Sequence, residues 1–474
     1  MSKKLLPNKQ EYPAEWYTKV MQLADLADYG PAKGSMIFKP YGYAIWEQMQ
    51  NAMDRLIKAK GVQNAYFPLL IPMSLIKKEA SHIKGFAPEL AVVTHGGGEK
   101  LEEPLAIRPT SEAIMYNSYA KWIESWRDLP VMMNQWNNVV RWEKRTLPFL
   151  RTSEFLWQEG HTAHSNHQEA IEIQEWAMQM YAQIFREWLA LDGFEGWKSQ
   201  SERFAGADTT MSYEALMPSG KALQSATSHD LGRNFSKTFD IKFQDKTGSE
   251  SFVWQTSWGL STRSIGGLIM AHGDDNGLRL PPKLAPVQVV IVPVLPKPAI
   301  LDHCRKLLAQ LKKAGVRSMI DDRDNETFGY KLNKWEVKGV PLIFKIGARE
   351  TREKNITVKR RFDGEEQTLL ADNIKEGVSK ILDKIQDSML EASRQYLAAE
   401  TREAHDYHEF KEIVKKDKGF IKVWWNDDVE IEAKIKAETK AASCCQPLSW
   451  GKGQGKDFFT GEPASYQWIF AQSY

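Results

Sequence analysis

The stretch VVRWEKRTLPFLRTSEFLWQEGHTAH, from Val139 to His164, packs charged and large apolar residues closely together. Three arginines, three glutamates and two histidines alternate with tryptophan, phenylalanine and leucine. A solvated surface would not need so many large apolar residues, and a core would not tolerate so many unpaired charges. The pattern is therefore typical of neither a plain surface nor a plain core.

The segments on either side of KRTLPF predict two extended arms joined by a loop, with alternate side chains on one face. Arg141 and Glu143 then share a face in the first arm. The inward-facing residues of the second arm are Glu154 or Phe155, followed by Trp157, Glu159 and His161. Arginines on a sheet suit a polyphosphate, and acids with aromatic walls suit an amine-bearing small molecule. An exposed hairpin with cross-strand ion pairs explains the same residues at least as well.

Length and composition limit the classes of protein. A chain of 474 residues is too long for one core, so we expect two to four domains. No apolar run is long enough to cross a membrane, and the N-terminal residues lack the apolar centre of a signal peptide. Three cysteines cannot form a disulfide framework. We therefore expect a cytoplasmic protein with no membrane partner.

Charge is unevenly distributed along the chain. Between Lys297 and Arg361 there are 17 Lys and Arg and 8 Asp and Glu, a local net charge of +9, so the remaining residues carry −7. A basic module on a near-neutral or acidic body is typical of polyanion binding, although a solvated lysine-rich surface explains the charge nearly as well.

Periodicity predicts the order of elements. Before a proline cluster at 279–286 we expect helices over 14–60, a buried strand at 64–72 and a long helix that Ser165 and Gln168 cap. A half-exposed antiparallel strand over 237–244 and a strand that leads into a helix near Arg263 follow. Beyond the cluster, strands alternate with helices, which predicts a small, mostly parallel α/β module. A helical stretch from about Asn373 to Lys418 precedes the final segment.

Familiar nucleotide and metal motifs are missing from the sequence. It contains neither GxxxxGK[ST] nor a GxGxxG that follows a strand, and HGGGEK (95–100) is better explained as a turn than as a phosphate loop. His161, His164 and His167 are spaced three apart, but a helix that begins at Ser165 would keep their rings from converging. We therefore predict no metal site.

Four ordered blocks resemble the prolyl members of the class II aminoacyl-tRNA synthetases. The opening stretch is similar to motif 2, LAIRPTSEAIM (105–115) to the amino-acid loop, residues 255–282 to motif 3, and FPLLIP to motif 1 with Pro68 at the dimer contact. The resemblance covers essentially the whole chain, in the archaeal/eukaryotic arrangement. It implies an α/β fold: a catalytic domain (1–284) with an antiparallel sheet flanked by helices, an α/β anticodon-binding domain (285–392), and a small α+β C-terminal domain (393–474).

The resemblance also implies roles for individual residues. Arg141 and Arg263 would be the catalytic arginines. The expected proline-binding residues are Thr110, Glu112, Arg141, Trp157, Glu159, His161, His229 and Gly259. The expected ATP-binding residues are Arg141, Glu143, Arg151, Thr152, Phe155, Gln224, Thr227, Ser261 and Arg263. The expected tRNA contacts are Trp335, Glu336, Lys338 and Lys359.

The implied reaction has two steps: proline attacks ATP to form prolyl-adenylate, and the prolyl group then passes to tRNA(Pro). Mg²⁺ would travel with ATP, and the chain would act as a homodimer. Only 95 residues separate Gly160 from Thr256, so the large editing insertion of bacterial-type relatives is absent. Many relatives carry a four-cysteine zinc site near the C-terminus. The positions that align with those cysteines fall on or near Asn426, Ile431, Asp457 and Thr460, so we expect no zinc.

The sequence leaves two alternatives to a prolyl enzyme open. A threonyl or seryl class II enzyme would bring metal ligands or an added tRNA-binding arm, and neither is evident in the sequence. A catalytically silent, synthetase-like regulator would be expected to lose one of the ATP arginines, yet Arg141, Arg151 and Arg263 are all present.

Overall fold

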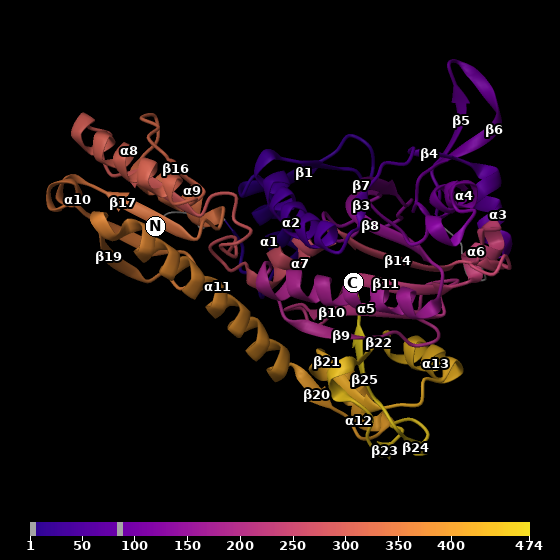
Figure 1. The fold of residues 1–474 in the computed structure, drawn as a ribbon. Coiled ribbons are helices and arrows are strands. Elements are labelled where there is room, and N and C mark those ends of the chain that lie inside the picture. The colour runs from indigo at the N-terminus through magenta and orange to yellow at the C-terminus, as the bar shows by residue number, and fades with distance from the viewer. Residues whose placement is uncertain (1–5, 83–88) are drawn as a thin grey trace.

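A computed structural model describes residues 6–82 and 89–474. Its centre is an 11-stranded sheet in the order β20-β21-β25-β22-β9-β10-β11-β14-β8-β7-β3 (Figure 1). The part that the resemblance assigns to the catalytic domain, called the catalytic sheet below, comprises β3 (Gln63–Asn64), β7 (Val131–Val140), β8 (Glu154–His164), β9 (Gly193–Trp197), β10 (Thr209–Leu216), β11 (Ala222–Gly232) and β14 (Trp254–Ser261). These strands run antiparallel except β3, which pairs parallel with β7. The predicted antiparallel sheet is confirmed.

Helices cover the catalytic sheet because their apolar stripes match its faces. The long helix α5 (His167–Glu187) contacts β8, β10, β11 and β14, and it buries Ile173, Ala177, Met180, Tyr181 and Ile184. The other helices of this domain are α1 (Pro13–Leu23), α2 (Pro40–Ala59), α3 (Met73–His82), α4 (Glu112–Trp122), α6 (Asn234–Phe239) and α7 (Arg263–His272). Its small sheets are β1 (Ala27–Tyr29) with β2 (Met36–Phe38), β4 (Leu70–Pro72) with β5 (Val92–Gly96) and β6 (Glu99–Ile107), and β12 (Lys242–Gln244) with β13 (Glu250–Phe252).

The module that the resemblance assigns to anticodon binding has a sheet in the order β16-β15-β17-β18-β19. Its strands are β15 (Val289–Pro293), β16 (Ser318–Ile320), β17 (Leu342–Ile346), β18 (Asn355–Arg360) and β19 (Glu366–Leu370). The first three are parallel, as predicted, whereas β18 and β19 are antiparallel. The sheet packs with α8 (Pro298–Lys313), α9 (Phe328–Val337), α10 (Ala348–Glu353) and α11 (Ile374–Ala399).

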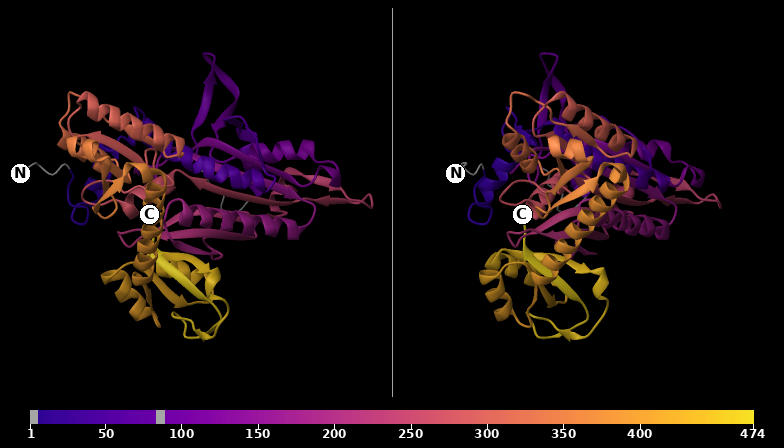
Figure 2. Two further views of the ribbon diagram at one scale, coloured as in Figure 1. Left: turned by 60° about the vertical axis from the view of Figure 1, so that its left-hand side comes forward. Right: turned by 90° about the vertical axis from the view of Figure 1, so that its left-hand side faces the viewer.

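The C-terminal residues extend the catalytic sheet instead of forming a detached unit. Gln446 and Pro447 of β22 (Ala441–Pro447) pair with Trp197 and Gly196 of β9. The remaining elements are β20 (Thr401–Glu403), α12 (Tyr407–Lys416), β21 (Phe420–Trp424), α13 (Val429–Thr439), β23 (Gly455–Lys456), β24 (Pro463–Ala464) and β25 (Gln467–Gln472). Figure 2 shows this yellow domain against the catalytic body from two further sides, with α11 crossing between the domains. Helix α11 passes residue 392 without a break.

Four local predictions were wrong. Residues 64–72 do not form one strand, because the backbone leaves the sheet after Asn64 and Pro68 has no N–H to donate. Asn166, not Ser165, caps α5, since its Oδ1 accepts the N–H of Glu169 at 3.0 Å. Residues 237–244 form the end of α6 and then β12, with Asp240 between them at φ 58°. The expected helix over 373–418 is interrupted by β20.

The described residues contain neither a membrane-spanning helix nor a cluster of metal-ligating side chains. None of the helices formed by residues 6–82 and 89–474 is long and apolar enough to cross a lipid bilayer. Within the same ranges no group of three or more His, Cys, Asp or Glu could hold a metal ion.

Candidate active site

A cavity of about 290 Å³ opens on the face of the sheet formed by β8, β11 and β14. Strand alternation and register bring its residues together. His229, Ser257 and His161 occupy one cross-strand row. Thr227, Gly259 and Glu159 occupy the next row, and Ser261 with Trp157 the one after. Three neighbouring strands therefore present a continuous polar floor.

Thirteen of the sixteen predicted catalytic, proline and ATP residues line this cavity: Thr110, Glu112, Arg141, Phe155, Trp157, Glu159, His161, Gln224, Thr227, His229, Gly259, Ser261 and Arg263. The other three, Glu143, Arg151 and Thr152, do not. The sequence had predicted that Arg141 and Glu143 share one face of a strand, and this was wrong. Strand β7 ends at Val140, so both residues lie in the connection to β8. Arg151 Nε donates to Glu143 Oε2 at 2.7 Å, which holds this connection together.

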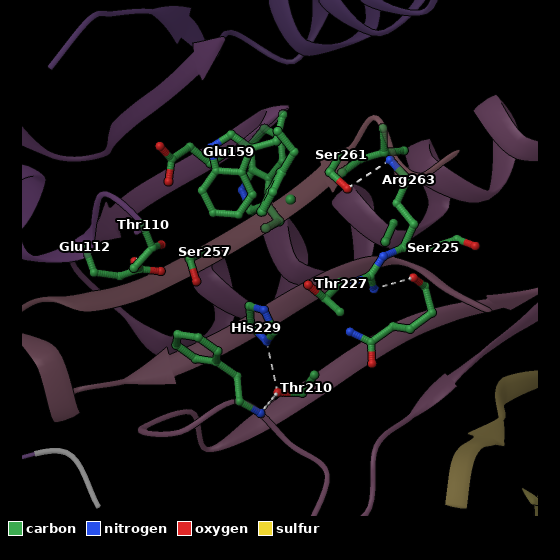
Figure 3. Close-up of a pocket in the computed structure, with 18 of the residues that line it drawn as sticks. Thr110, Glu112, Glu159, Thr210, Ser225, Thr227, His229, Ser257, Ser261 and Arg263 are labelled. Carbon is green, nitrogen blue, oxygen red and sulfur yellow. Dashed lines mark hydrogen bonds between the residues drawn. The ribbon is translucent and has the colours of Figure 1, made fainter. Parts of the chain in front are cut away.

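The two ends of the cavity differ in charge. Figure 3 shows Arg263 and Ser261 at one end and Thr110 and Glu112 at the other. Arg263 Nε donates to the carbonyl of Leu150 at 3.1 Å, and Arg141 Nε donates to the carbonyl of Pro109 at 3.1 Å. Arg141 is exposed and Arg263 is half-buried, although protein atoms surround both guanidinium groups. The surrounding protein lowers the pKa of each guanidinium, and the nearby charge of Arg141 lowers that of Arg263 further.

The acidic end is held by a dense hydrogen-bond network. Glu159 is buried and accepts from Ser111 Oγ, from Asn137 Nδ2 at 2.6 Å and from His161 Nε2 at 3.0 Å. Burial alone would raise the pKa of Glu159, but these donors lower it. Burial would likewise lower the pKa of His161, yet the carboxylates of Glu159 and Glu112 raise it. Thr110 Oγ1 donates to Glu112, which orients that carboxylate. This end of the cavity therefore carries fixed negative charge.

His229 has the opposite protonation preference. Burial lowers the pKa of His229 to about 3, and the charge of His161 adds to the effect. Its Nδ1 lies 3.0 Å from Thr210 Oγ1, a contact that Figure 3 marks. His229 is therefore a neutral hydrogen-bonding group in the cavity wall.

The lowered pKa of His229 makes the free energy of unfolding depend on pH. Between pH 6.5 and about 3 the unfolded chain binds a proton at His229 that the folded chain does not, so stability falls as the pH falls. From pH 7 to pH 5 the loss is about 2 kcal/mol. We expect the free energy of unfolding, measured with urea, to fall by about 2 kcal/mol more between pH 7 and pH 5 in the wild type than in His229→Asn. Equal losses in both proteins would contradict the neutral assignment.

Sequence reasoning missed eight lining residues: Glu202, Phe204, Thr210, Ser225, Ala226, Ser257, Trp258 and Leu260. Ser225 and Ser257 lie two residues before Thr227 and Gly259, so strand alternation could have found them. Glu202 and Phe204 come from the irregular loop between β9 and β10, and no local pattern identifies them.

The three histidines do not converge on a metal. His161 contacts Glu159, His164 Nε2 lies 2.8 Å from Thr162 Oγ1, and His167 Nε2 lies 2.6 Å from Asp230 Oδ2.

Of the four residues predicted to contact tRNA, two are buried. Trp335 Nε1 donates to Asp321 Oδ2 at 2.8 Å inside the module. Lys338 pairs with Asp25 of the catalytic domain at 2.8 Å. Glu336 and Lys359 are partly exposed and form an ion pair with each other.

Comparison with known families gives three matches along the chain. Residues 95–272 match the tRNA synthetase class II core domain (G, H, P, S and T). Residues 288–381 match the anticodon binding domain, and residues 407–474 match the prolyl-tRNA synthetase C-terminal family.

Relatives align over nearly the full length. The chain is 48% identical to a proline–tRNA ligase of Chloroherpeton thalassium, covering 100% of both chains. It is 47% identical to proline–tRNA ligase 2 of Clostridioides difficile, covering 98% of this chain and 97% of that protein. The crystal structure of prolyl-tRNA synthetase from Cryptosporidium parvum with L-proline and AMP superposes with a TM-score of 0.95 at 40% identity, covering 99% of this chain and 97% of that one. A complex of the same enzyme with halofuginone and AMPPNP gives 0.95 at 41% identity, covering 99% of each.

Proposed function

The chain belongs to the prolyl-tRNA synthetases of class II, and we propose that the cavity on β8, β11 and β14 is where proline and ATP react. The chain catalyses the ATP-dependent attachment of L-proline to tRNA(Pro) in two steps, through prolyl-adenylate. The observation that carries the assignment of the cavity is its polarity. Arg263 lies at one end, Thr110 and Glu112 lie at the other, and Arg141 interacts with charges at both, which suits an anion and an ammonium that must meet.

We assign the cationic end to ATP. Arg141 would contact both the proline carboxylate and the α-phosphate, since a planar guanidinium can serve two anions. Arg263 and Phe155 would hold the adenine ring between them, while Gln224, Thr227 and Ser261 supply hydrogen bonds. Glu143, Arg151 and Thr152 would reach the nucleotide from the β7–β8 connection, Arg151 at the terminal phosphates. Mg²⁺ would bind phosphate oxygens of the incoming ATP.

We assign the acidic end to proline. Thr110 and Glu112 would hold the imino nitrogen, which is cationic in the free amino acid. Trp157, Glu159, His161 and His229 would form the walls of the pocket. A Cβ at Gly259 would lie 3.7 Å from the Trp157 ring, so the absence of a side chain there keeps the floor open.

Adenylate formation then needs no covalent enzyme intermediate. The proline carboxylate attacks the α-phosphorus, and pyrophosphate leaves with the electrons of the broken P–O bond. Arg141 and Arg263 would stabilise the negative charge that develops, so catalysis consists of positioning and electrostatic stabilisation.

We further propose that the chain is of the archaeal/eukaryotic type without an editing insertion. The 95 residues between Gly160 and Thr256 are occupied by α5, β9, β10, β11, α6, β12 and β13. Most of these elements belong to the catalytic sheet or pack on it, which leaves no room for another domain. The threonyl and seryl alternatives, and a silent regulator, are disfavoured by the full-length relatives.

The domain limits 1–284, 285–392 and 393–474 remain part of the proposal. Residues 285–392 would bind the anticodon of tRNA(Pro), with Glu336 and Lys359 as candidate contacts, whereas Trp335 and Lys338 would support the fold. We propose a cytoplasmic homodimer that pairs near motif 1. Tyr66, Leu70, Val92 and Trp122 are exposed apolar side chains in that region, which supports an interface there.

The C-terminal residues do not fit a zinc ion. A structural site needs four thiolate or imidazole ligands, and the aligned positions supply none. Asp457 instead links two loops: its carboxylate accepts the backbone N–H of Asn426 at 2.9 Å, of Phe459 at 2.9 Å and of Thr460 at 3.0 Å. Beside it the rings of Trp425, Phe458, Trp468 and Phe470 pack together.

We therefore expect Asp457→Ala to destabilise the C-terminal domain by about 2–4 kcal/mol, because three backbone donors lose a charged acceptor. A chelator should leave the unfolding midpoint of the wild type unchanged. Urea unfolding with and without EDTA measures both effects. Elemental analysis that finds one zinc per chain, with unfolding by EDTA, would refute the expectation.

Amino-acid-dependent ATP–pyrophosphate exchange across all twenty amino acids tests the proposed function. We expect rapid exchange with proline and weak exchange with alanine, because excluding a smaller molecule from an apolar pocket is worth only about 1–3 kcal/mol. Exchange with threonine or serine and none with proline would refute the proposal.

A further inference from the structure

The loop between β9 and β10, residues 198–208, forms one wall of the cavity through Glu202 and Phe204. Its other side faces the C-terminal domain. Four consecutive loop residues, 199–202, contact that domain by hydrogen bonds or ion pairs. A segment more than 220 residues away in sequence therefore holds a wall of the active site.

Glu432 of α13 makes the central contact. Its side chain is buried, 1% exposed. Oε2 accepts the hydroxyl of Ser199 at 2.8 Å and that of Ser201, while Oε1 accepts the backbone N–H of Ser443 in β22 at 2.9 Å. Ser443 Oγ in turn donates to Ser199 Oγ at 2.8 Å. One carboxylate thus joins α13, β22 and the loop.

Two flanking contacts fix the direction of the loop. The backbone N–H of Gln200 donates to Asp427 Oδ1 at 3.1 Å, and Gln200 Nε2 donates to the Asp427 carbonyl at 3.1 Å. Glu202, which lines the cavity, pairs with Lys436 of α13 at 2.7 Å. In Figure 1, α13 lies close to the β9–β22 junction, as these contacts require.

The network continues to the floor of the cavity. The backbone N–H of Phe204 donates to Thr210 Oγ1 at 3.0 Å, and the same oxygen lies 3.0 Å from His229 Nδ1. The Phe204 and His229 rings are 4.6 Å apart between centroids. Through the backbone between Ser201 and Phe204, Glu432 is therefore linked to residues that line the cavity.

The chemistry of Glu432 indicates that it does more than hold the two domains together. Its hydrogen-bond donors are hydroxyls and an amide N–H, all neutral, and burying a carboxylate costs free energy that apolar packing would avoid. Charge-assisted hydrogen bonds are directional, so they specify the position of the groups that donate to them. A carboxylate at this interface therefore fixes the loop in one position relative to α13.

We propose that Glu432 is a positioning residue for the amino-acid pocket: it anchors loop 198–208 so that Phe204 and Glu202 close the wall around the proline ring. The inference rests on the proposed placement of proline. It gives the C-terminal domain a function in substrate selection, since alanine lacks the ring methylenes that this wall would contact.

Glu432→Gln tests the proposal, because it keeps the shape and removes the charge. Pyrophosphate exchange should show a KM for proline raised about 5- to 10-fold, with KM for ATP and kcat within about 2-fold. The ratio of kcat/KM for proline over alanine should fall. Hydrogen exchange of residues 198–208 should become faster. Glu430→Gln, which changes an exposed carboxylate on the same helix, is the matched control and should leave all five quantities unchanged.

A KM for proline unchanged in Glu432→Gln, or KM values for proline and ATP that rise together, would overturn the inference. If Glu432→Gln lowers Tm, Ser201→Ala removes one donor from the same carboxylate and is judged by the same outcomes. A wild type without proline-dependent exchange would instead refute the proposed function, so the two failures are distinguishable.

Discussion

Arg141→Lys is expected to lower proline-dependent pyrophosphate exchange by about 10²-fold or more, nearly as much as Arg141→Ala. A lysine keeps the charge but presents it at a point, whereas the guanidinium can contact two anions at once. The structure adds a second reason. Arg141 Nε donates to the Pro109 carbonyl, and the guanidinium lies 5.6 Å from the Phe155 ring centroid and 5.5 Å from that of Trp157. An ammonium would lose this fixed orientation.

Steady-state exchange with saturating proline and ATP measures the effect. Arg145→Lys is the matched control, because Arg145 is exposed in the same β7–β8 connection and exchange requires no tRNA. We expect Arg145→Lys to retain full exchange. Near-normal activity of Arg141→Lys would show that Arg141 does not hold both reactants.

Much of the candidate site could be predicted from the sequence because strands have a period of two. Phe155, Trp157, Glu159 and His161 alternate along 154–164, and the structure places all four in the cavity. Their meeting with His229 and Gly259 depends on register between strands distant in sequence, which no local pattern gives. The resemblance to a family supplied that part.

Irregular and long-range features could not be predicted. Glu202 and Phe204 lie in a loop that contacts α13, and the pairing of β22 with β9 spans some 250 residues of chain. The family resemblance implied a tRNA contact at Trp335, in the basic module, but that side chain belongs to the core behind β15 and β17. Charge patterns indicate a surface and do not identify which residues lie on it.

Glu112→Gln removes the charge that the proposed site sets opposite the proline nitrogen, and the KM for proline should rise about 10²-fold. Removing one partner of a buried, hydrogen-bonded charge pair costs about 2–5 kcal/mol, and about 2.7 kcal/mol corresponds to that factor. Glu112 is 3% exposed, so water cannot replace the lost interaction. The KM for ATP should change little, because Arg263, which would hold the adenine, lies at the opposite end of the cavity from Glu112.

The same variant tests the electrostatics of the acidic end. Glu112 helps to raise the pKa of His161, so the amide should lower the pKa of His161 and shift the pH dependence of kcat/KM for proline toward lower pH. Glu102→Gln, on the exposed part of β6, is the control and should keep both the KM and the profile. A buried charge pair predicts a large loss of proline affinity in Glu112→Gln. If the KM for proline of this variant stays within about 3-fold of the wild-type value, the imino nitrogen does not bind at Glu112. Glu159, whose carboxylate is held by His161 and Asn137 on the neighbouring floor, would then be the buried acid that takes that role.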